Sequence, residues 1–160
     1  MAGELLVEAA RECKNATDDV HFAKSILLSG AVDLMVSPIL DEHGIESLHV
    51  SLSKAAARFG GENLDKLTPE QLQKTVGKGI KYFRFTYNSL KHTGSSKVKA
   101  SDDLDFFANL EQEAYHMIDA CISDFNKLPL SQGYINTVFS DELLSLLQSH
   151  WRIPHEAPLP

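Results

Sequence analysis

Residues 72–90 place an apolar side chain every three or four positions, and this spacing constrains the fold more than any other feature. At 100° per residue the apolar row falls within about 80° on one side of a helix. The row consists of Leu72, Val76, Ile80, Phe83, Tyr87 and Leu90. Thr68, Pro69 and Gln71 stand before it as the N-cap, the first helical residue and the partner of a capping box. We therefore predict one long helix from Pro69 to about His92.

The same periodicity predicts helices at residues 4–14, 17–44, 45–59 and 110–127, with a last one near 140–149. Thr17 and Asn109 are the expected N-caps, Pro38 should kink or restart the second helix, and Gly44 should end it. No segment has the alternation of a strand. The prediction is an all-α protein: an antiparallel bundle of five to six helices forming a single domain over 1–150, followed by a Pro-rich extended tail over 151–160.

Two helices have faces that their own pattern defines. In residues 45–59 the side chains expected to point inward are Leu48, Leu52, Ala55, Ala56 and Phe59. In residues 110–127 they are Ala114, Met117, Ile118, Cys121, Ile122 and Phe125. Gly77 and Gly79 weaken the long helix by about 1 kcal/mol each relative to Ala, which indicates that another backbone approaches there.

Charge is unevenly distributed along the chain. The net charge is −7, which argues against a general nucleic-acid coat protein. Between Gln71 and Ala100, however, there are seven Lys or Arg residues and no Asp or Glu. Such a window is consistent either with an anion-binding face or with a surface that docks on the acidic remainder of the fold. A second stripe on the long helix contains the candidate binding residues Lys81, Arg84, Asn88, Lys91 and His92.

Several classes of site have no support in the sequence. The histidines lack HxxxH or HExxH spacing, so we expect no metal site, and no phosphate loop, nucleophile elbow or other cofactor motif is present. Cys13 and Cys121 fall on apolar faces and are expected to be buried thiols. The apolar run 26–40 is broken by Asp33 and Pro38 and looks too short to span a bilayer, so we expect a cytoplasmic protein without a membrane segment.

Three segments carry a resemblance to a known family. The segment YNSLKHTG, residues 87–94, resembles the motif of HEPN domains, in which a helix ends in Arg, a polar residue, three variable residues and His. Residues 22–44 and 109–128 resemble the helices that accompany this motif in bacterial HEPN-like proteins. The resemblance implies a helical bundle, pairing of two copies through the motif helix, and metal-independent RNA cleavage in which His is the acid or base and Arg holds phosphate. Asn88 and His92 match the motif, whereas Tyr87 stands at the position of the Arg.

This departure decides the functional expectation. A neutral phenol cannot replace a fixed cation at a phosphate. Arg84 stands one turn before Tyr87, but on a regular helix it lies about 80° and 12 Å of rise from His92. We expect a non-catalytic HEPN-like module that binds a nucleotide, RNA or a partner protein. The alternatives are a helical dimeric adaptor that docks on an acidic protein surface, and a metal-independent endoribonuclease in which His92 is catalytic within a rearranged site. Homodimerisation is expected because Tyr82 and Phe85 lie outside the apolar row.

Overall fold

The computed structural model describes residues 1–91 and 108–128, and every regular element in these two segments is helical. The elements are α1 (Ala2–Lys14), α2 (Asp19–Glu42), α3 (Leu48–Phe59), η1 (Leu64–Lys66), α4 (Pro69–Phe83), α5 (Phe85–Lys91) and α6 (Leu110–Lys127). The predicted all-α fold class is confirmed. The helix expected near 140–149 and the tail 151–160 lie outside the described residues.

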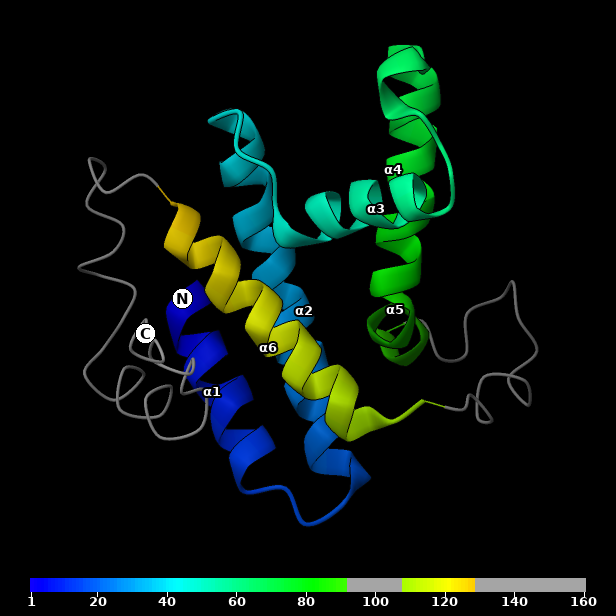
Figure 1. The fold of residues 1–160 in the computed structure, drawn as a ribbon. Helices are drawn as coiled ribbons and strands as arrows, with labels where there is room; N and C mark the ends of the chain where they lie inside the picture. Colours follow the sequence, from blue (N-terminus) through cyan, green and yellow to red (C-terminus); the bar gives the residue numbers. More distant parts are fainter. Residues whose placement is uncertain (92–107, 129–160) are drawn as a thin grey trace, which may run out of the picture.

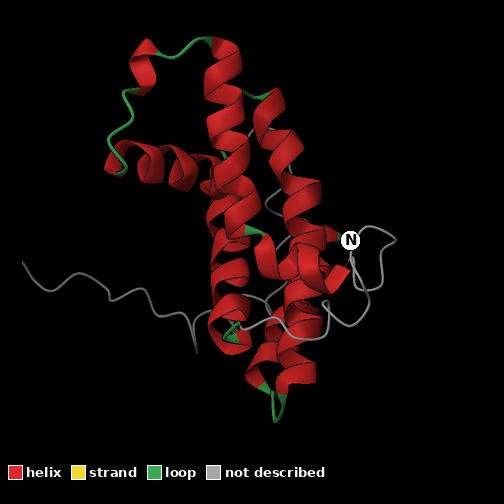
Figure 2. Cartoon of the chain, turned by 90° about the vertical axis from the view of Figure 1, so that its right-hand side faces the viewer, coloured by secondary structure: helices red, strands yellow, loops and turns green. Residues whose placement is uncertain are grey.

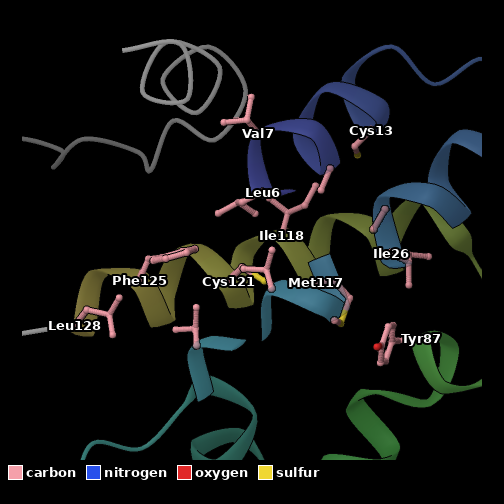
Figure 3. Close-up of a cluster of buried hydrophobic side chains, with 14 of the residues drawn as sticks. Leu6, Val7, Cys13, Ile26, Tyr87, Met117, Ile118, Cys121, Phe125 and Leu128 are labelled. Atoms are coloured by element: carbon pink, nitrogen blue, oxygen red, sulfur yellow. The ribbon is translucent and has the colours of Figure 1, made fainter. Parts of the chain in front are cut away.

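Helices α1, α2 and α6 form a three-helix bundle that contains most of the core (Figure 1). In Figure 1, α1 is antiparallel to both α2 and α6, and α2 and α6 run in the same direction. Small residues let the helices approach closely, and the hydroxyl of Ser25 donates to the carbonyl of Ala9 at 2.9 Å. Figure 3 shows the core side chains, which include Leu6, Val7, Cys13, Ile26, Met117, Ile118, Cys121 and Phe125. The predicted inward face of residues 110–127 is confirmed, with Ile122 only partly buried.

The helix starts follow their capping residues. Thr68 and Gln71 form the predicted capping box, in which each side chain accepts a hydrogen bond from the other's backbone N–H, at 3.2 and 2.9 Å. The side chain of Asn109 caps α6 through the N–H of Gln112 at 3.1 Å, as predicted. The cap of α2 is Asp18 and not Thr17, because the Asp18 carboxylate accepts from two backbone N–H groups of the first turn.

Pro38 does not restart α2, contrary to expectation, and the helix continues through it for 24 residues. The proline is exposed, as is Leu34, the residue whose carbonyl loses its hydrogen bond, so water can satisfy that group. By length and composition α2 could cross a membrane, since a window of it has a mean hydropathy of 1.5. The run 26–40 therefore belongs to a longer helix, and the expectation that it does not span a membrane stays a prediction. In the protein α2 packs between α1 and α6, and 44% of that window is buried.

We call residues 48–83, which hold α3, η1 and α4, the arm. In Figures 1 and 2 the arm stands beside the bundle, with α3 crossing α4. Helix α4 has no fully buried residue, and its apolar row is only partly covered. It lies close to α3 at Gly79, where an added Cβ would lie 2.5 Å from the Cβ of Ser53. The expected approach of another backbone is thus found at Gly79, whereas nothing lies within 4 Å of such a Cβ at Gly77.

The predicted inward face of α3 is only partly right. Leu48, Leu52 and Ala55 are half-buried, but Ala56 is exposed, Phe59 is 93% exposed, and the fully buried residues are His49 and Ser53. The helix also begins later than predicted, at Leu48, where the carboxylate of Asp124 on α6 accepts the first backbone N–H at 2.7 Å. The N-terminal cap comes from a residue 76 positions away, and the buried face is determined by polar partners in α2. Both are tertiary contacts, so the spacing of apolar residues within α3 could not predict them.

Helix α5 returns to the bundle and packs on α2. Tyr87 is its main anchor, because the ring is buried directly against Gly30. A Cβ at position 30 would overlap the ring, so the absence of a side chain at Gly30 makes the space that Tyr87 fills. Tyr87 is therefore a core aromatic residue.

Candidate functional site

The predicted single helix is divided at Arg84, the residue on which the candidate site depends. Helix α4 ends at Phe83 and α5 begins at Phe85, while Arg84 has φ −99° and ψ 14°. Its backbone bonds remain, since its N–H donates to Ile80 and its carbonyl accepts from Asn88, both at 2.9 Å. Figure 1 shows α4 upright and α5 almost end-on below it. The expectation of one continuous helix is wrong, and the residues on either side of Arg84 do not share one straight face.

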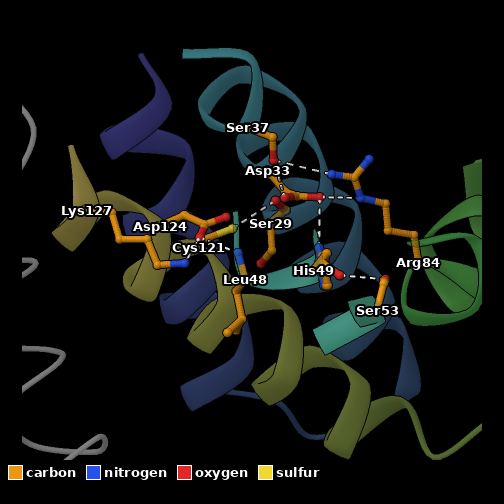
Figure 4. Close-up of polar contacts among 10 residues, drawn as sticks. All are labelled: Ser29, Asp33, Ser37, Leu48, His49, Ser53, Arg84, Cys121, Asp124 and Lys127. Atoms are coloured by element: carbon orange, nitrogen blue, oxygen red, sulfur yellow. Dashed lines mark hydrogen bonds and ion pairs between the residues drawn. The ribbon is translucent and has the colours of Figure 1, made fainter. Parts of the chain in front are cut away.

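The side chain of Arg84 points into the protein. Its Nε lies 2.6 Å from Oδ2 of Asp33, and its Nη2 donates to the hydroxyl of Ser37 at 3.4 Å. Ser37 in turn donates to Oδ1 of Asp33 at 2.9 Å, which closes a triangle of polar contacts (Figure 4). The side chains of Arg84 and Asp33 are only 16% and 1% exposed. The guanidinium is therefore engaged by an internal carboxylate rather than presented to solvent.

His49 of α3 completes the cluster from the arm. Its Nδ1 lies 3.4 Å from Oδ2 of Asp33, and the residue is fully buried. Its ring stacks on Phe83 with centroids 6.2 Å apart and lies 5.4 Å from the ring of His116 on α6. The Nε2 atoms of both histidines have no hydrogen-bond partner in the part of the chain that the structure describes. Asp33, His49, Arg84 and His116 thus join α2, α3, the α4–α5 break and α6, and we call these four residues the junction cluster.

The electrostatics of the junction cluster favour a charged Asp33 and a neutral His116. Burial alone would raise the pKa of Asp33, but the contacts with His49 and Arg84 and the hydrogen bond from Ser37 bring it below its usual value. Burial, and then the proximity of His49, lower the pKa of His116. One carboxylate faces one guanidinium in this largely buried space, so a proton on His116 would add an uncompensated charge.

The predicted binding residues are not gathered at one point. Lys81 is exposed on α4, and Asn88 is half-buried on α5. Lys91 is exposed, with its Nζ 5.5 Å from the centroid of the Tyr87 ring, a cation–π contact. Arg84 points inward to Asp33. His92 lies outside the described residues, so its predicted role stays a prediction.

The two cysteines are buried, as predicted. Cys121 donates to the carbonyl of Ser29 at 3.2 Å, and burial raises the pKa of its thiol well above the usual value. Burial also raises the pKa of Cys13. The thiolate is the reactive form, so neither cysteine is a suitable nucleophile at neutral pH.

The sequence reasoning missed His49 and His116 and did not pair Asp33 with any residue. One signal for Asp33 was present, since it is the single charged residue within the apolar run 26–40. A carboxylate on a helix that is apolar on most sides needs a buried cation or donors, so a partner could have been expected. Which of the fifteen Lys and Arg residues would supply it could not be read from spacing.

Within residues 1–91 and 108–128, no group of three or more His, Cys, Asp or Glu side chains is arranged to hold a metal ion. The fold and site therefore define an all-α protein whose polar centre is a buried ion-pair cluster. Comparison of the chain with protein-family models, curated proteins and solved structures finds no match.

Proposed function

We propose that this chain is a non-catalytic HEPN-like module that binds RNA. The observation that carries the non-catalytic part is the pairing of Arg84 with Asp33, Nε to Oδ2 at 2.6 Å. Arg84 is the one arginine close to the motif, and the Nε–Nη2 edge of its guanidinium already faces a carboxylate and a serine hydroxyl. That edge is the one that would otherwise bind a phosphate with two parallel hydrogen bonds.

Tyr87, which stands at the motif position of the Arg, supports the same proposal. The position at which the motif expects an Arg carries a phenol that is buried against Gly30. Metal-independent cleavage of a phosphodiester needs preorganised donors for the charge that develops, and removal of one such group typically costs on the order of 100–1000-fold in rate. With Arg84 engaged and position 87 inside the core, no cation is fixed at the expected place in the part of the chain that the structure describes.

RNA is the ligand that the charge distribution favours. The three helices of the bundle, α1, α2 and α6, contain eleven acidic and four basic residues, whereas the arm contains six basic and three acidic ones. The arm thus has a charge of +3 beside a bundle of −7. Concentration of positive charge on one part of an acidic protein is the electrostatic pattern of polyanion binding.

Two measurements on a mixed-sequence RNA test this proposal. Binding followed by fluorescence anisotropy at several salt concentrations should give an affinity that falls steeply with salt, because phosphate contacts release counterions. Incubation of the same RNA with wild type and His92→Ala in the presence of a chelator should give no difference in cleavage. Cleavage by the wild type that disappears in His92→Ala would refute the non-catalytic assignment, and absence of salt-dependent binding would refute RNA as the ligand.

A second candidate, a dimeric adaptor, is favoured by one specific observation. Phe59, Tyr82 and Phe85 on the arm and α5 are 93%, 77% and 55% exposed, and α4 carries an apolar row that is only partly covered. Exposed aromatic side chains of this kind are enriched in protein interfaces. Sedimentation equilibrium should then detect a homodimer that Phe59→Ser or Tyr82→Ser weakens, and a monomer at all accessible concentrations would exclude this candidate.

A further inference from the structure

One face of α4 combines positive charge with an exposed aromatic ring. With Lys74 at zero and 100° per residue, Lys78, Lys81 and Tyr82 fall within a sector of about 100°, along about 12 Å of helix. The apolar row that faces α3 lies on the opposite side of the same helix. All four side chains in the sector are exposed, and Tyr82 is 77% exposed. We call Lys74, Lys78, Lys81 and Tyr82 the outer stripe of α4.

Among residues 1–91 and 108–128, no acidic side chain forms an ion pair with the lysines of the outer stripe. The ion pairs between described residues involve other cations, among them Lys24 with Glu12, Lys54 with Glu46 and Arg84 with Asp33. After Glu70 in the first turn, α4 contains no acidic residue. The positive charge of the stripe is therefore available to an anionic ligand.

We infer that the outer stripe of α4, and not the motif helix α5, is where this protein binds RNA, and that the bound RNA is single-stranded. This inference rests on the proposed RNA binding and adds the place and the form of the ligand. Successive lysines stand about one turn, or 5.4 Å, apart, which lets them meet successive phosphates of an extended strand. Tyr82 adjoins the last lysine and offers a ring face on which an unpaired base can stack.

The aromatic ring is what distinguishes a single strand from a duplex. In a duplex the base faces are covered by their neighbours, so an exposed tyrosine gains nothing from them. A single strand can present both its phosphates to the lysines and a base to the ring. Tyr82 itself is held at the start of the α4–α5 break, where its ring contacts Phe83 edge to face with centroids 5.5 Å apart. The rest of the ring is open to a ligand, since Tyr82 is 77% exposed.

The test compares variants of the full chain on a labelled oligouridine and on the same oligomer annealed to oligoadenosine. The variant Lys74→Gln, Lys78→Gln, Lys81→Gln should reduce the salt slope by about 2, since each single-strand phosphate contact contributes about 0.7. Tyr82→Ala should weaken oligouridine binding on the order of tenfold and leave duplex binding unchanged. All four positions are exposed, so circular dichroism and thermal melting should match those of the wild type.

Matched controls separate the stripe from general charge and general aromatic exposure. Lys14→Gln, Lys24→Gln, Lys66→Gln makes the same change in net charge elsewhere, and Phe59→Ala removes an exposed ring on α3. Both controls should bind oligouridine as the wild type does. If the control lysines matter as much as the stripe, the stripe assignment fails while RNA binding stands. If the duplex binds as tightly as the single strand and Tyr82→Ala changes neither, the single-strand assignment fails. A wild type that binds neither RNA overturns the inference together with the proposed function.

Discussion

The bundle and the arm are held together by different kinds of contact. Within the bundle, apolar and small side chains of α1, α2 and α6 are almost completely covered, and Leu6, Ile26 and Ile118 have no exposed surface. Within the arm, α4 packs on α3 through a row that stays partly open. The arm meets the bundle through polar contacts that include the junction cluster and the hydrogen bond from the Leu48 N–H to Asp124. Dense apolar packing gives stability that depends little on pH, whereas polar contacts make the position of the arm depend on the charges of the groups that form them.

The largest expected effect tests the difference in packing. Phe125→Ala removes a ring that is almost fully buried in the bundle and should lower the free energy of unfolding by roughly 3–5 kcal/mol. Phe83→Ala removes a ring that is only partly covered, so the loss should be about 1–2 kcal/mol. Urea unfolding of both variants measures the two values. Equal losses would show that the arm is packed as tightly as the bundle.

The next effect tests the ion pair of the junction cluster. Arg84→Met leaves the buried carboxylate of Asp33 without its guanidinium and should cost about 2–4 kcal/mol, somewhat less than a fully buried pair because Arg84 retains some exposure. The double variant Asp33→Leu, Arg84→Met should recover part of this loss, since neither charge is left unpaired. Arg58→Met, an exposed control on α3, should change stability by about 0.5 kcal/mol or less. A double variant no more stable than Arg84→Met would argue against a direct pair.

Two glycines of α4 should respond to the same substitution in opposite directions. Gly79→Ala places a Cβ 2.9 Å from the backbone Cα of Ser53 and should destabilise the protein by about 1–3 kcal/mol. Gly77→Ala meets nothing within 4 Å and should stabilise it by about 0.5–1 kcal/mol through better helix propensity. Thermal melting of the two variants side by side gives the answer. Stabilisation by Gly79→Ala would mean that α3 and α4 are less closely apposed than described.

The smallest effect is a pH dependence that belongs to the junction cluster. The pKa of His116 is lowered in the folded protein, so the unfolded chain binds the proton more readily. The stability that neutral His116 contributes is fully present above its ordinary pKa of about 6.5 and is lost as the pH falls below it. Asp33 also has a lowered pKa, but its contribution persists until the pH falls below about 3.8.

Urea unfolding at a series of pH values between these two limits measures this dependence, to which Asp119 and Asp124 also contribute because burial raises the pKa of both carboxyls. The comparison of variants is therefore what assigns a share to the histidine. The groups that act on His116 are His49 of α3, Asp33 of α2 and Glu113 of its own helix. His116→Phe should flatten the dependence of stability on pH in this window. The control His43→Gln, at an exposed site, should leave the slope of stability against pH as it is in the wild type. An unchanged slope in His116→Phe would assign the dependence to another group.

The sequence predicted what depends on neighbours along the chain. The capping box at Thr68, the cap at Asn109 and the inward face of residues 110–127 each follow from residues within a few turns. The predicted direction of Arg84 failed because it assumed a straight helix with its cation in solvent, whereas Asp33 lies 51 positions earlier and draws the side chain inward. The face of α3 was only partly predicted for the same reason, since His49 is buried by partners in α2 and α6.

The packing of Tyr87 against Gly30 has a consequence for the sequences of other chains with this fold. The ring occupies the space that a side chain at position 30 would need, so the two positions act as a matched pair of large and absent side chains. A chain of this fold with Ala or a larger residue at the position of Gly30 must carry a smaller residue opposite it, or move α5 away from α2. Introducing an Arg at position 87 would likewise displace α5 before it restored any phosphate site. Covariation of these two positions would therefore indicate how closely α5 is docked in any relative.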